Sequence, residues 1–118
     1  MDIVQLREYC LGKPHVTESF PFGPGVLVFK VGGKMFALTN VDNQDPSVNL
    51  KCDPERAVEL REYHAEIEPG YHMNKTMWNT VSICGTLSNS FIEGLIDHSY
   101  DLIVASLTKK LRAELGFS

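Results

Sequence analysis

The chain has 118 residues, of which 43% are hydrophobic and 22% charged, and this composition excludes both a disordered chain and two independently cored domains. Its 15 acidic and 11 basic residues give a net charge of −4, and no run of Lys or Arg occurs. Nucleic-acid binding through bulk charge is therefore disfavoured, and we expect one folded domain over residues 1–118.

The N-terminal third predicts a helix followed by an edge strand. Ile3, Leu6 and Cys10 recur along one side of residues 3–11, and Gly12 follows as a helix stop. Residues 15–22 are β-prone but contain Pro21, which is typical of an edge strand that leads into a turn.

Residues 26–40 predict a β-hairpin, because Gly32-Gly33 separates two β-prone runs. A regular register would place Val31 opposite Lys34, Phe29 opposite Phe36 and Leu27 opposite Leu38 on the core face. The other face would be mixed, which indicates either a partial cover or a contact surface; it would carry Val26, Val28, Lys30, Met35, Ala37 and Thr39.

The remaining segments predict two further strands and two helices. Residues 47–52 alternate as a half-buried strand, and Asp53-Pro54-Glu55 is typical of a helix start, with the helix ending near His64. Pro69-Gly70 fits a turn before a strand at about 76–84, and a long amphipathic helix follows from Ser90 towards Ala113. We therefore expect an α+β, two-layer fold, an antiparallel sheet with helices packed on one face, in the order α-β(3-4)-α-β(1-2)-α.

Catalytic and metal-binding motifs are not found in the sequence. The four histidines fall on four different elements without an HxxxH or CxxC pair, so we expect no metal site and no cofactor. Adjacent helix residues point about 100° apart, so Asp97-His98-Ser99 cannot form a hydrolase relay, and His98 is better interpreted as a partly buried structural residue. We expect a protein that is not an enzyme.

Cysteine usage and the N-terminus indicate the compartment. Cys10, Cys52 and Cys84 are odd in number and lie in apolar-patterned segments, as expected of small buried side chains in a reduced protein. No secretory signal opens the chain, and no apolar run approaches the ~20 residues of a membrane span. A cytoplasmic protein without a membrane segment follows.

Residues 69–80, PGYHMNKTMWNT, interleave aromatic side chains with amides and one lysine, and contain no acidic residue. Such a segment suits stacking on a base and contact with a phosphate. The alternative, which the chemistry alone favours, is that its large side chains close one end of the core while Asn74 and Asn79 hold turns. Lys30, Lys51 and Trp78 would share the outward sheet face if the strand alternation holds.

Four ordered strings resemble the MmcQ/YjbR family over about residues 9–110: FKVGGKMFAL at 29–38, NLKCDPERAVELRE at 49–62, PGYHMNKTMWNTV at 69–81 and LIDHSYDLIVASL at 95–107. The resemblance implies a fold like that of CyaY and the secretion chaperones, and DNA binding through a "double wing" arrangement. A proline is usual in that family near Thr108, where this chain has none, so the last helix is expected to continue further. The family's characteristic residues fall on Phe29, Gly32, Gly33, Lys34, Phe36, Lys51, Pro54, Gly70, Tyr71, His72, Asn74, Lys75, Trp78 and Asn79.

Two functions follow from the resemblance. In the first, DNA is the partner: Lys34, Lys51 and Lys75 contact phosphates, with Lys30 on the same surface. Hydrogen bonds then come from His72, Asn74 and Asn79, while Tyr71 and Trp78 supply aromatic surface. In the second, the mixed apolar sheet face (Val26, Val28, Met35, Ala37) contacts a protein partner, a second copy or a small ligand. Residues 69–118 carry four acids and four bases, so the negative excess lies before them and a local site is not forbidden.

Overall fold

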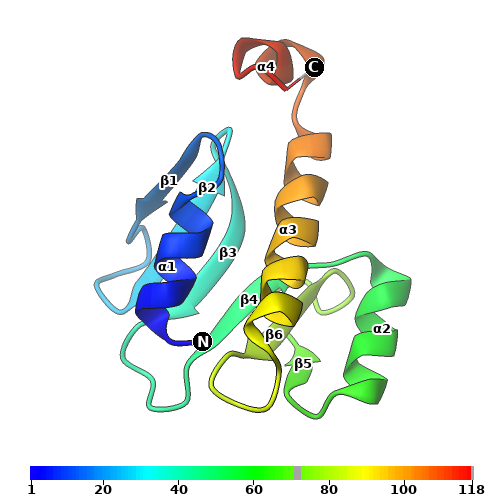
Figure 1. Cartoon of the computed structure of the whole chain (residues 1–118). Helices are drawn as coiled ribbons and strands as arrows, with labels where there is room; N and C mark the ends of the chain where they lie inside the picture. The colour runs from blue at the N-terminus through cyan, green and yellow to red at the C-terminus, as the bar shows by residue number, and fades with distance from the viewer. Residues whose placement is uncertain (71–72, 118) are drawn as a thin grey trace.

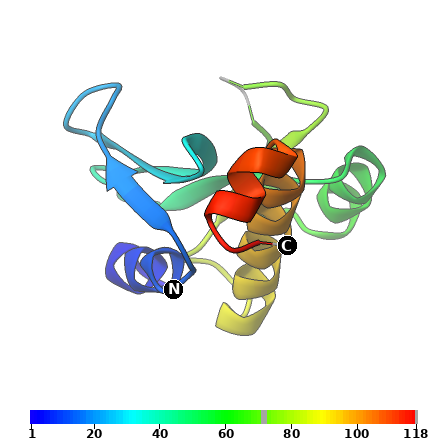
Figure 2. The same ribbon diagram turned by 90° about the horizontal axis from the view of Figure 1, so that it is seen from above.

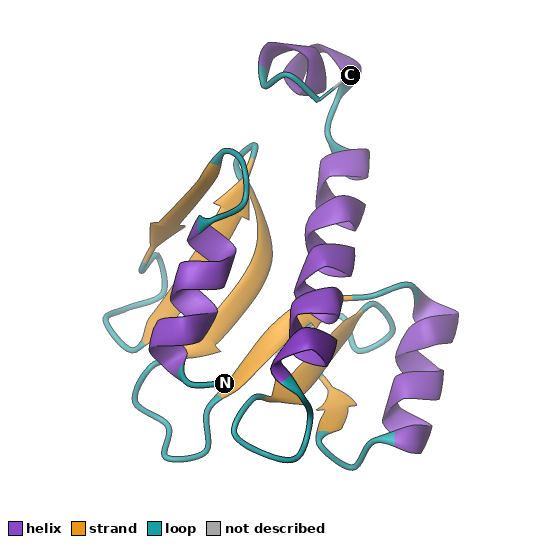
Figure 3. Cartoon of the chain, viewed as in Figure 1, coloured by secondary structure: helices purple, strands orange, loops and turns teal. Residues whose placement is uncertain are grey.

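The computed structural model describes residues 1–70 and 73–117, and its organising element is one six-stranded antiparallel sheet in the order β1-β2-β3-β4-β6-β5. Figure 1 labels and colours the elements in chain order, and Figure 3 distinguishes the helices from the strands of the sheet. The elements are α1 (Ile3–Leu11), β1 (Val16–Ser19), β2 (Val26–Val31), β3 (Lys34–Asn40), β4 (Ser47–Lys51), α2 (Pro54–Tyr63), β5 (Ile67–Pro69), β6 (Trp78–Ser82), α3 (Asn89–Ser106) and α4 (Lys109–Glu114).

The helices α1 and α3 lie on the same face of the sheet, and the β1–β2 loop rises on the opposite face (Figure 2). The core fills the space beneath the helices, where Leu6 of α1, Phe29 of β2 and Ile96 of α3 are fully buried. The predicted α+β fold with antiparallel strands is thereby confirmed. Within the described residues, no helix combines the length and apolarity needed to cross a membrane.

The β2–β3 hairpin contains a bulge that changes which side chains face the core. Gly32 and Gly33 both have positive φ, 59° and 79°, as the predicted two-residue turn requires. Lys30 pairs with Met35, but Phe29 pairs with Ala37, so Phe36 is an extra residue on β3. The alternation of the strand is inverted beyond this point.

The bulge corrects the predicted register of residues 37–40. Ala37 and Thr39, predicted on the outer face, are buried on the core side, where Thr39 Oγ1 donates to the Ser47 carbonyl at 2.6 Å. Leu38, predicted in the core, faces outward and pairs with Val28 and Asn49. Phe36 still packs in the core, edge-on to Tyr100 at 5.3 Å between ring centroids.

The C-terminal helix is broken rather than continuous, which corrects the prediction that it runs on past Thr108. α3 ends at Ser106, Leu107 has an extended conformation, and Thr108 Oγ1 accepts from Leu111 N–H as the N-cap of α4. Leu107 is buried against the hairpin tip, where a Cβ on Gly32 would lie 2.7 Å from Leu107 Cδ1. The break therefore lets the chain close over the end of the hairpin.

Two consecutive residues of α3 hold the junction between β4 and α2. Ser99 Oγ accepts from Lys51 N–H at 2.9 Å and donates to the Phe36 carbonyl at 2.6 Å. His98 Nε2 accepts from Asp53 N–H at 3.1 Å, and Asp53 in turn caps α2 through Arg56 N–H. His98 is thus a structural residue, as predicted, and its imidazole is neutral in this arrangement because an imidazolium cannot accept a hydrogen bond.

Candidate ligand site on the open sheet face

The outer face of the central strands is built from rows of directly opposed side chains. Opposed residues of antiparallel strands share a face. One row runs Val28, Leu38, Asn49, Thr80 across β2, β3, β4 and β6, and Glu68 of β5 extends it. The neighbouring row contains Lys30 opposite Met35, and Lys51 opposite Trp78.

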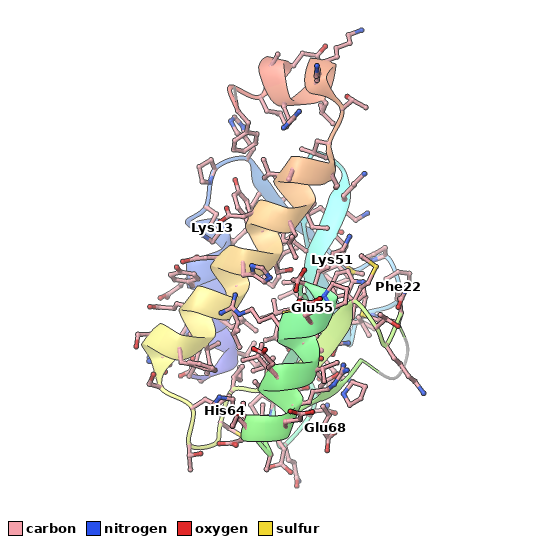
Figure 4. The ribbon with its side chains drawn as sticks, turned by 90° about the vertical axis from the view of Figure 1, so that its right-hand side faces the viewer. Lys13, Phe22, Lys51, Glu55, His64 and Glu68 are labelled. Atoms are coloured by element: carbon pink, nitrogen blue, oxygen red, sulfur yellow. The ribbon has the colours of Figure 1, made fainter. Side chains whose placement is uncertain are left out.

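A hollow of about 580 Å³ lies on this face. Its sides come from three loops, each of which contributes one side chain: Phe22 from the β1–β2 loop, Asn43 from the β3–β4 loop and Met73 from the β5–β6 loop. In the edge-on view of Figure 4, Phe22 lies on the side of the sheet away from α3. Its lining residues are Phe22, Val26, Met35, Leu38, Asn40, Asn43, Ser47, Asn49, Met73 and Thr80.

The lining is chemically two-sided. Over β2 and β3 it is apolar, with Val26, Met35 and Leu38 beneath Phe22, which is 68% exposed. Over β4 and β6 it carries hydroxyl and carboxamide groups, namely Ser47, Asn49 and Thr80. None of the ten described lining side chains is titratable.

Internal hydrogen bonds fix the orientation of two lining carboxamides. Asn49 Oδ1 accepts from Thr80 Oγ1 at 2.6 Å, and Asn40 Oδ1 accepts from Asp42 N–H at 3.1 Å. In both residues the oxygen is engaged, so each of these two carboxamides offers its Nδ2 group to a ligand. The two groups therefore favour ligands that accept hydrogen bonds.

Charged groups border the hollow without lining it. Glu68 lies opposite Thr80, and the Asp42 carboxylate lies beside Gly25, where an added Cβ would be 3.0 Å from Asp42 Oδ2. Lys30, opposite Met35, and Lys51, opposite Trp78, belong to the neighbouring row. Acidic and basic groups thus both lie near a described lining that carries no charge.

The structure brings three of the sequence-predicted site residues together. Lys51 is the strand partner of Trp78, and Lys30 shares their outer face, as the alternation predicted. A Cβ on Gly70 would lie 3.1 Å from Trp78 Cβ, so the chain that follows β5 passes close to Trp78 at this glycine. Lys34 lies elsewhere: its Nζ donates to the carbonyl of Ser106 at 3.2 Å, at the end of α3.

The later segment divides between turns and core. Asn74 Oδ1 accepts from Thr76 N–H at 3.0 Å, so Asn74 holds a turn. Lys75 lies in this turn, and its carbonyl accepts from Arg61 Nη1 at 3.1 Å. Tyr71 and His72, which were predicted to supply aromatic surface and a hydrogen bond, lie outside the described residues.

Asn79 faces the core, which corrects its place in the predicted ligand surface. It is 1% exposed, because β6 alternates and turns Trp78 and Thr80 outward. Its Oδ1 accepts from Arg61 Nη1 at 2.9 Å, and its Nδ2 donates to the Ala57 carbonyl at 3.5 Å. The amide therefore joins α2 to the sheet.

Sequence reasoning missed the residues that form most of the hollow, namely Phe22, Leu38, Asn40, Asn43, Ser47, Asn49, Met73 and Thr80. The alternation of residues 47–51 already placed Ser47 and Asn49 on the outer face, which was a usable signal. Phe22 and Asn43 lie in loops whose course depends on the packing of the whole domain.

The titratable residues on the helix side of the sheet serve packing. Lys13 Nζ lies 2.5 Å from Asp97 Oδ1, which also accepts from Tyr9 Oη at 2.6 Å. Burial, followed by this hydrogen bond, raises the pKa of the Tyr9 phenol. These contacts join α1 to α3 on the face opposite the hollow, and Figure 4 shows Lys13 on that side. Among residues 1–70 and 73–117 no three metal-ligating side chains cluster.

The three cysteines are free in the described structure. Cys10 and Cys52 are buried, as predicted, and burial raises the pKa of the Cys10 thiol to about 12. Cys84 is exposed, contrary to the prediction, because it follows the end of β6 in the turn that leads to α3.

The chain matches known proteins along most of its length. Residues 11–102 match the model of the YjbR family. The chain is 36% identical to the uncharacterised protein YjbR of Escherichia coli K12, over 95% of both chains, and 38% identical to the uncharacterised protein YbdF of E. coli O157:H7, over 88% of this chain and 85% of that one. Its fold is similar to the crystal structure of Deinococcus radiodurans protein DR2400, with a TM-score of 0.93 and 41% identity over 99% of this chain and 89% of that one. A Pseudomonas syringae protein aligns with a TM-score of 0.77 and 31% identity over 86% of this chain and 98% of that one.

Proposed function

The chain belongs to the YjbR family, and we propose that it is a binding module that holds a small ligand in the hollow of its open sheet face. The observation that carries this proposal is the hollow itself. Its volume of about 580 Å³ falls within the range of roughly 300–1,000 Å³ that is usual for small-molecule sites. An apolar lining with a few convergent polar groups is the usual composition of such sites.

We propose binding rather than catalysis because the described lining offers no group that could exchange a proton at neutral pH. Ser47 and Thr80 are the only hydroxyls that residues 1–70 and 73–117 contribute to the lining, and these residues contribute no histidine, carboxylate or lysine to activate them. A cytoplasmic location belongs to the same proposal, and the three free cysteines support it.

Backbone amide mapping tests this proposal. A library of small neutral and charged metabolites is titrated into ¹⁵N-labelled protein, and amide shifts are followed at Leu38, Asn49 and Thr80, with Glu59 and Glu93 as controls outside the hollow. The proposal expects saturable shifts for at least one compound, confined to the hollow. Shifts that concentrate on α1, α2 or α3 for every compound that binds would refute it.

DNA is the second candidate, and one observation favours it: Lys30, Lys51 and Trp78 occupy the same face, with Lys51 directly opposite Trp78. Two cations and a half-buried indole on one face suit a phosphate backbone and an unstacked base. The support is limited, since Lys34 is engaged with Ser106 and Glu68 lies on the same face.

The DNA candidate makes a separate prediction about salt. Binding of a labelled duplex at 20 mM salt should weaken about tenfold in Lys51→Ala and fall steeply between 50 and 200 mM salt. Lys110→Ala, an exposed lysine on α4, is the matched control and should change little. Equal losses in the two variants would indicate non-specific attraction, and no binding at micromolar protein would remove the candidate.

A further inference from the structure

We infer that the ligand of the hollow is an uncharged molecule with two sides, a ring-sized apolar body and an edge that accepts hydrogen bonds. This inference rests on the proposed function and specifies its ligand class. It is drawn from three properties of the lining: where the apolar side chains lie, which polar atoms are left unengaged, and how charge is arranged around them.

The apolar body is assigned to the half of the hollow over β2 and β3. Val26 and Leu38 form its floor, because the bulge at Phe36 turns Leu38 outward. Phe22 stands above them, exposed although it is large and aromatic. An apolar ring placed between Phe22 and Leu38 would cover both side chains, at roughly 25 cal/mol for each Å² removed from water.

The accepting edge is assigned to the half over β4 and β6. Asn49 Nδ2, on β4, is a donor whose partner oxygen is already engaged by Thr80. A carbonyl or ring nitrogen on the ligand would satisfy it, whereas a second donor would leave it unpaired. The hollow therefore selects acceptors on this side.

The described lining of the hollow is uncharged and disfavours a ligand that carries a charge. A phosphate, sulfonate or carboxylate within the hollow would find no cation among the described lining side chains and would lose its hydration. Glu68, opposite Thr80, and Asp42, beside Gly25, would repel it, whereas Lys30 and Lys51 in the neighbouring row would attract it. A cationic ligand meets the same balance with the signs reversed.

The size and walls of the hollow favour a small molecule over a polypeptide. Side chains from three separate loops, Phe22, Asn43 and Met73, stand around it. An extended peptide would need a groove open at both ends or a free strand edge, but the hollow lies over β2, β3, β4 and β6, all of which are paired on both sides.

A matched pair of dyes tests the charge requirement. N-phenyl-1-naphthylamine and 8-anilinonaphthalene-1-sulfonate share one aromatic framework and differ by the sulfonate. We expect the neutral dye to bind with enhanced fluorescence and the sulfonate to bind about tenfold more weakly. Phe22→Ser should weaken the neutral dye about fivefold or more, whereas Tyr63→Ser, which removes an 81% exposed aromatic from α2, should not.

A neutral dye with a carbonyl acceptor tests the second side. Nile red emits further to the red when its carbonyl accepts a hydrogen bond. We expect Asn49→Leu, which keeps the size but removes the donor, to shift the emission of the bound dye to the blue and to weaken binding about three- to tenfold. Asn89→Leu, at the exposed start of α3, is the control for an added surface leucine.

The outcomes separate the inference from the function on which it rests. If the sulfonate binds as tightly as the neutral dye and both depend on Phe22, the hollow is a site but its ligand class is wrong. If Asn49→Leu leaves the emission unchanged, the accepting edge is wrong. If no dye depends on Phe22, the proposed function itself fails. Dependence on Phe22, discrimination against the sulfonate and the blue shift together support the inference.

Discussion

Replacing Asn79 and Asn49 by alanine tests which face of the sheet each amide serves. The two residues belong to neighbouring strands, Asn79 opposite Leu50 and Asn49 opposite Thr80, and the substitution removes the same atoms from each. Asn79 lies 1% exposed beneath α2, whereas Asn49 lies on the outer face and lines the hollow.

The magnitude follows from the contacts that are lost. Asn79→Ala removes the acceptor of the Arg61 guanidinium, a hydrogen bond of 2.9 Å to a charged group that is worth about 1.5–3 kcal/mol. The bond to the Ala57 carbonyl is 3.5 Å long and adds little, while the small cavity costs on the order of 1 kcal/mol. We expect a loss of about 2–4 kcal/mol in the free energy of unfolding, against less than about 1 kcal/mol for Asn49→Ala.

Urea denaturation followed by circular dichroism at 222 nm measures both variants against the parent protein. A loss of 2–4 kcal/mol corresponds to a fall in Tm of roughly 8–16 °C for a domain of this size. Asn49→Ala should instead weaken binding of Nile red while leaving Tm nearly unchanged. Equal destabilisation by the two substitutions, or a stable Asn79→Ala that has lost ligand binding, would refute the assignment of Asn79 to the core.

Three further predictions concern the hairpin tip, His98 and the thiols. Gly32→Ala should lower the free energy of unfolding by about 2–3 kcal/mol, because its Cβ would meet Leu107 Cδ1 at 2.7 Å. Gly33→Ala would meet nothing within 4 Å and should cost only about 1 kcal/mol of backbone strain. Thermal unfolding compares the two variants, and equal losses would contradict the contact between Gly32 and Leu107. Burial, and after it the charge of Arg56, lowers the pKa of His98 in the folded state, while Asp53 and Asp101 act in the opposite direction. Because the unfolded chain then binds the proton more readily, the free energy of unfolding should fall as the pH drops below about 6.5. In urea titrations His98→Gln should flatten this dependence between pH 7 and 5, and an unchanged slope would show that His98 is not its source. An aromatic disulfide reagent at pH 8 should modify Cys84 rapidly and Cys10 and Cys52 only after unfolding in guanidinium, and fast modification of a second thiol in the native protein would contradict their burial.

Local signals in the sequence predicted the elements well. Asp53-Pro54 marks the start of α2, and Gly32-Gly33 marks the hairpin turn, because each depends on backbone chemistry within a few residues. Strand alternation predicted that Lys51 and Trp78 share the outer face, since both strands are regular there.

The failures arise where tertiary packing overrides the local pattern. The register of β3 depends on one extra residue, and nothing in the hydrophobic pattern distinguishes Phe36 as a bulge from Phe36 as a regular strand residue. The helix break at Leu107 places this side chain against Gly32, which is 75 positions away in the sequence, so the local pattern does not indicate the contact. Asn79 was placed on the ligand surface for its chemistry, although its position between Trp78 and Thr80 puts it on the opposite face.

The bulge at Phe36 also bears on how relatives are aligned. A homologous strand of the same length that lacked the bulge would keep the regular phase, so its counterpart of Leu38 would point inward and that of Thr39 outward. Two such strands would align without a gap and yet present opposite faces at these positions. Relatives should be grouped by the presence of this bulge before their ligands are assumed to be shared.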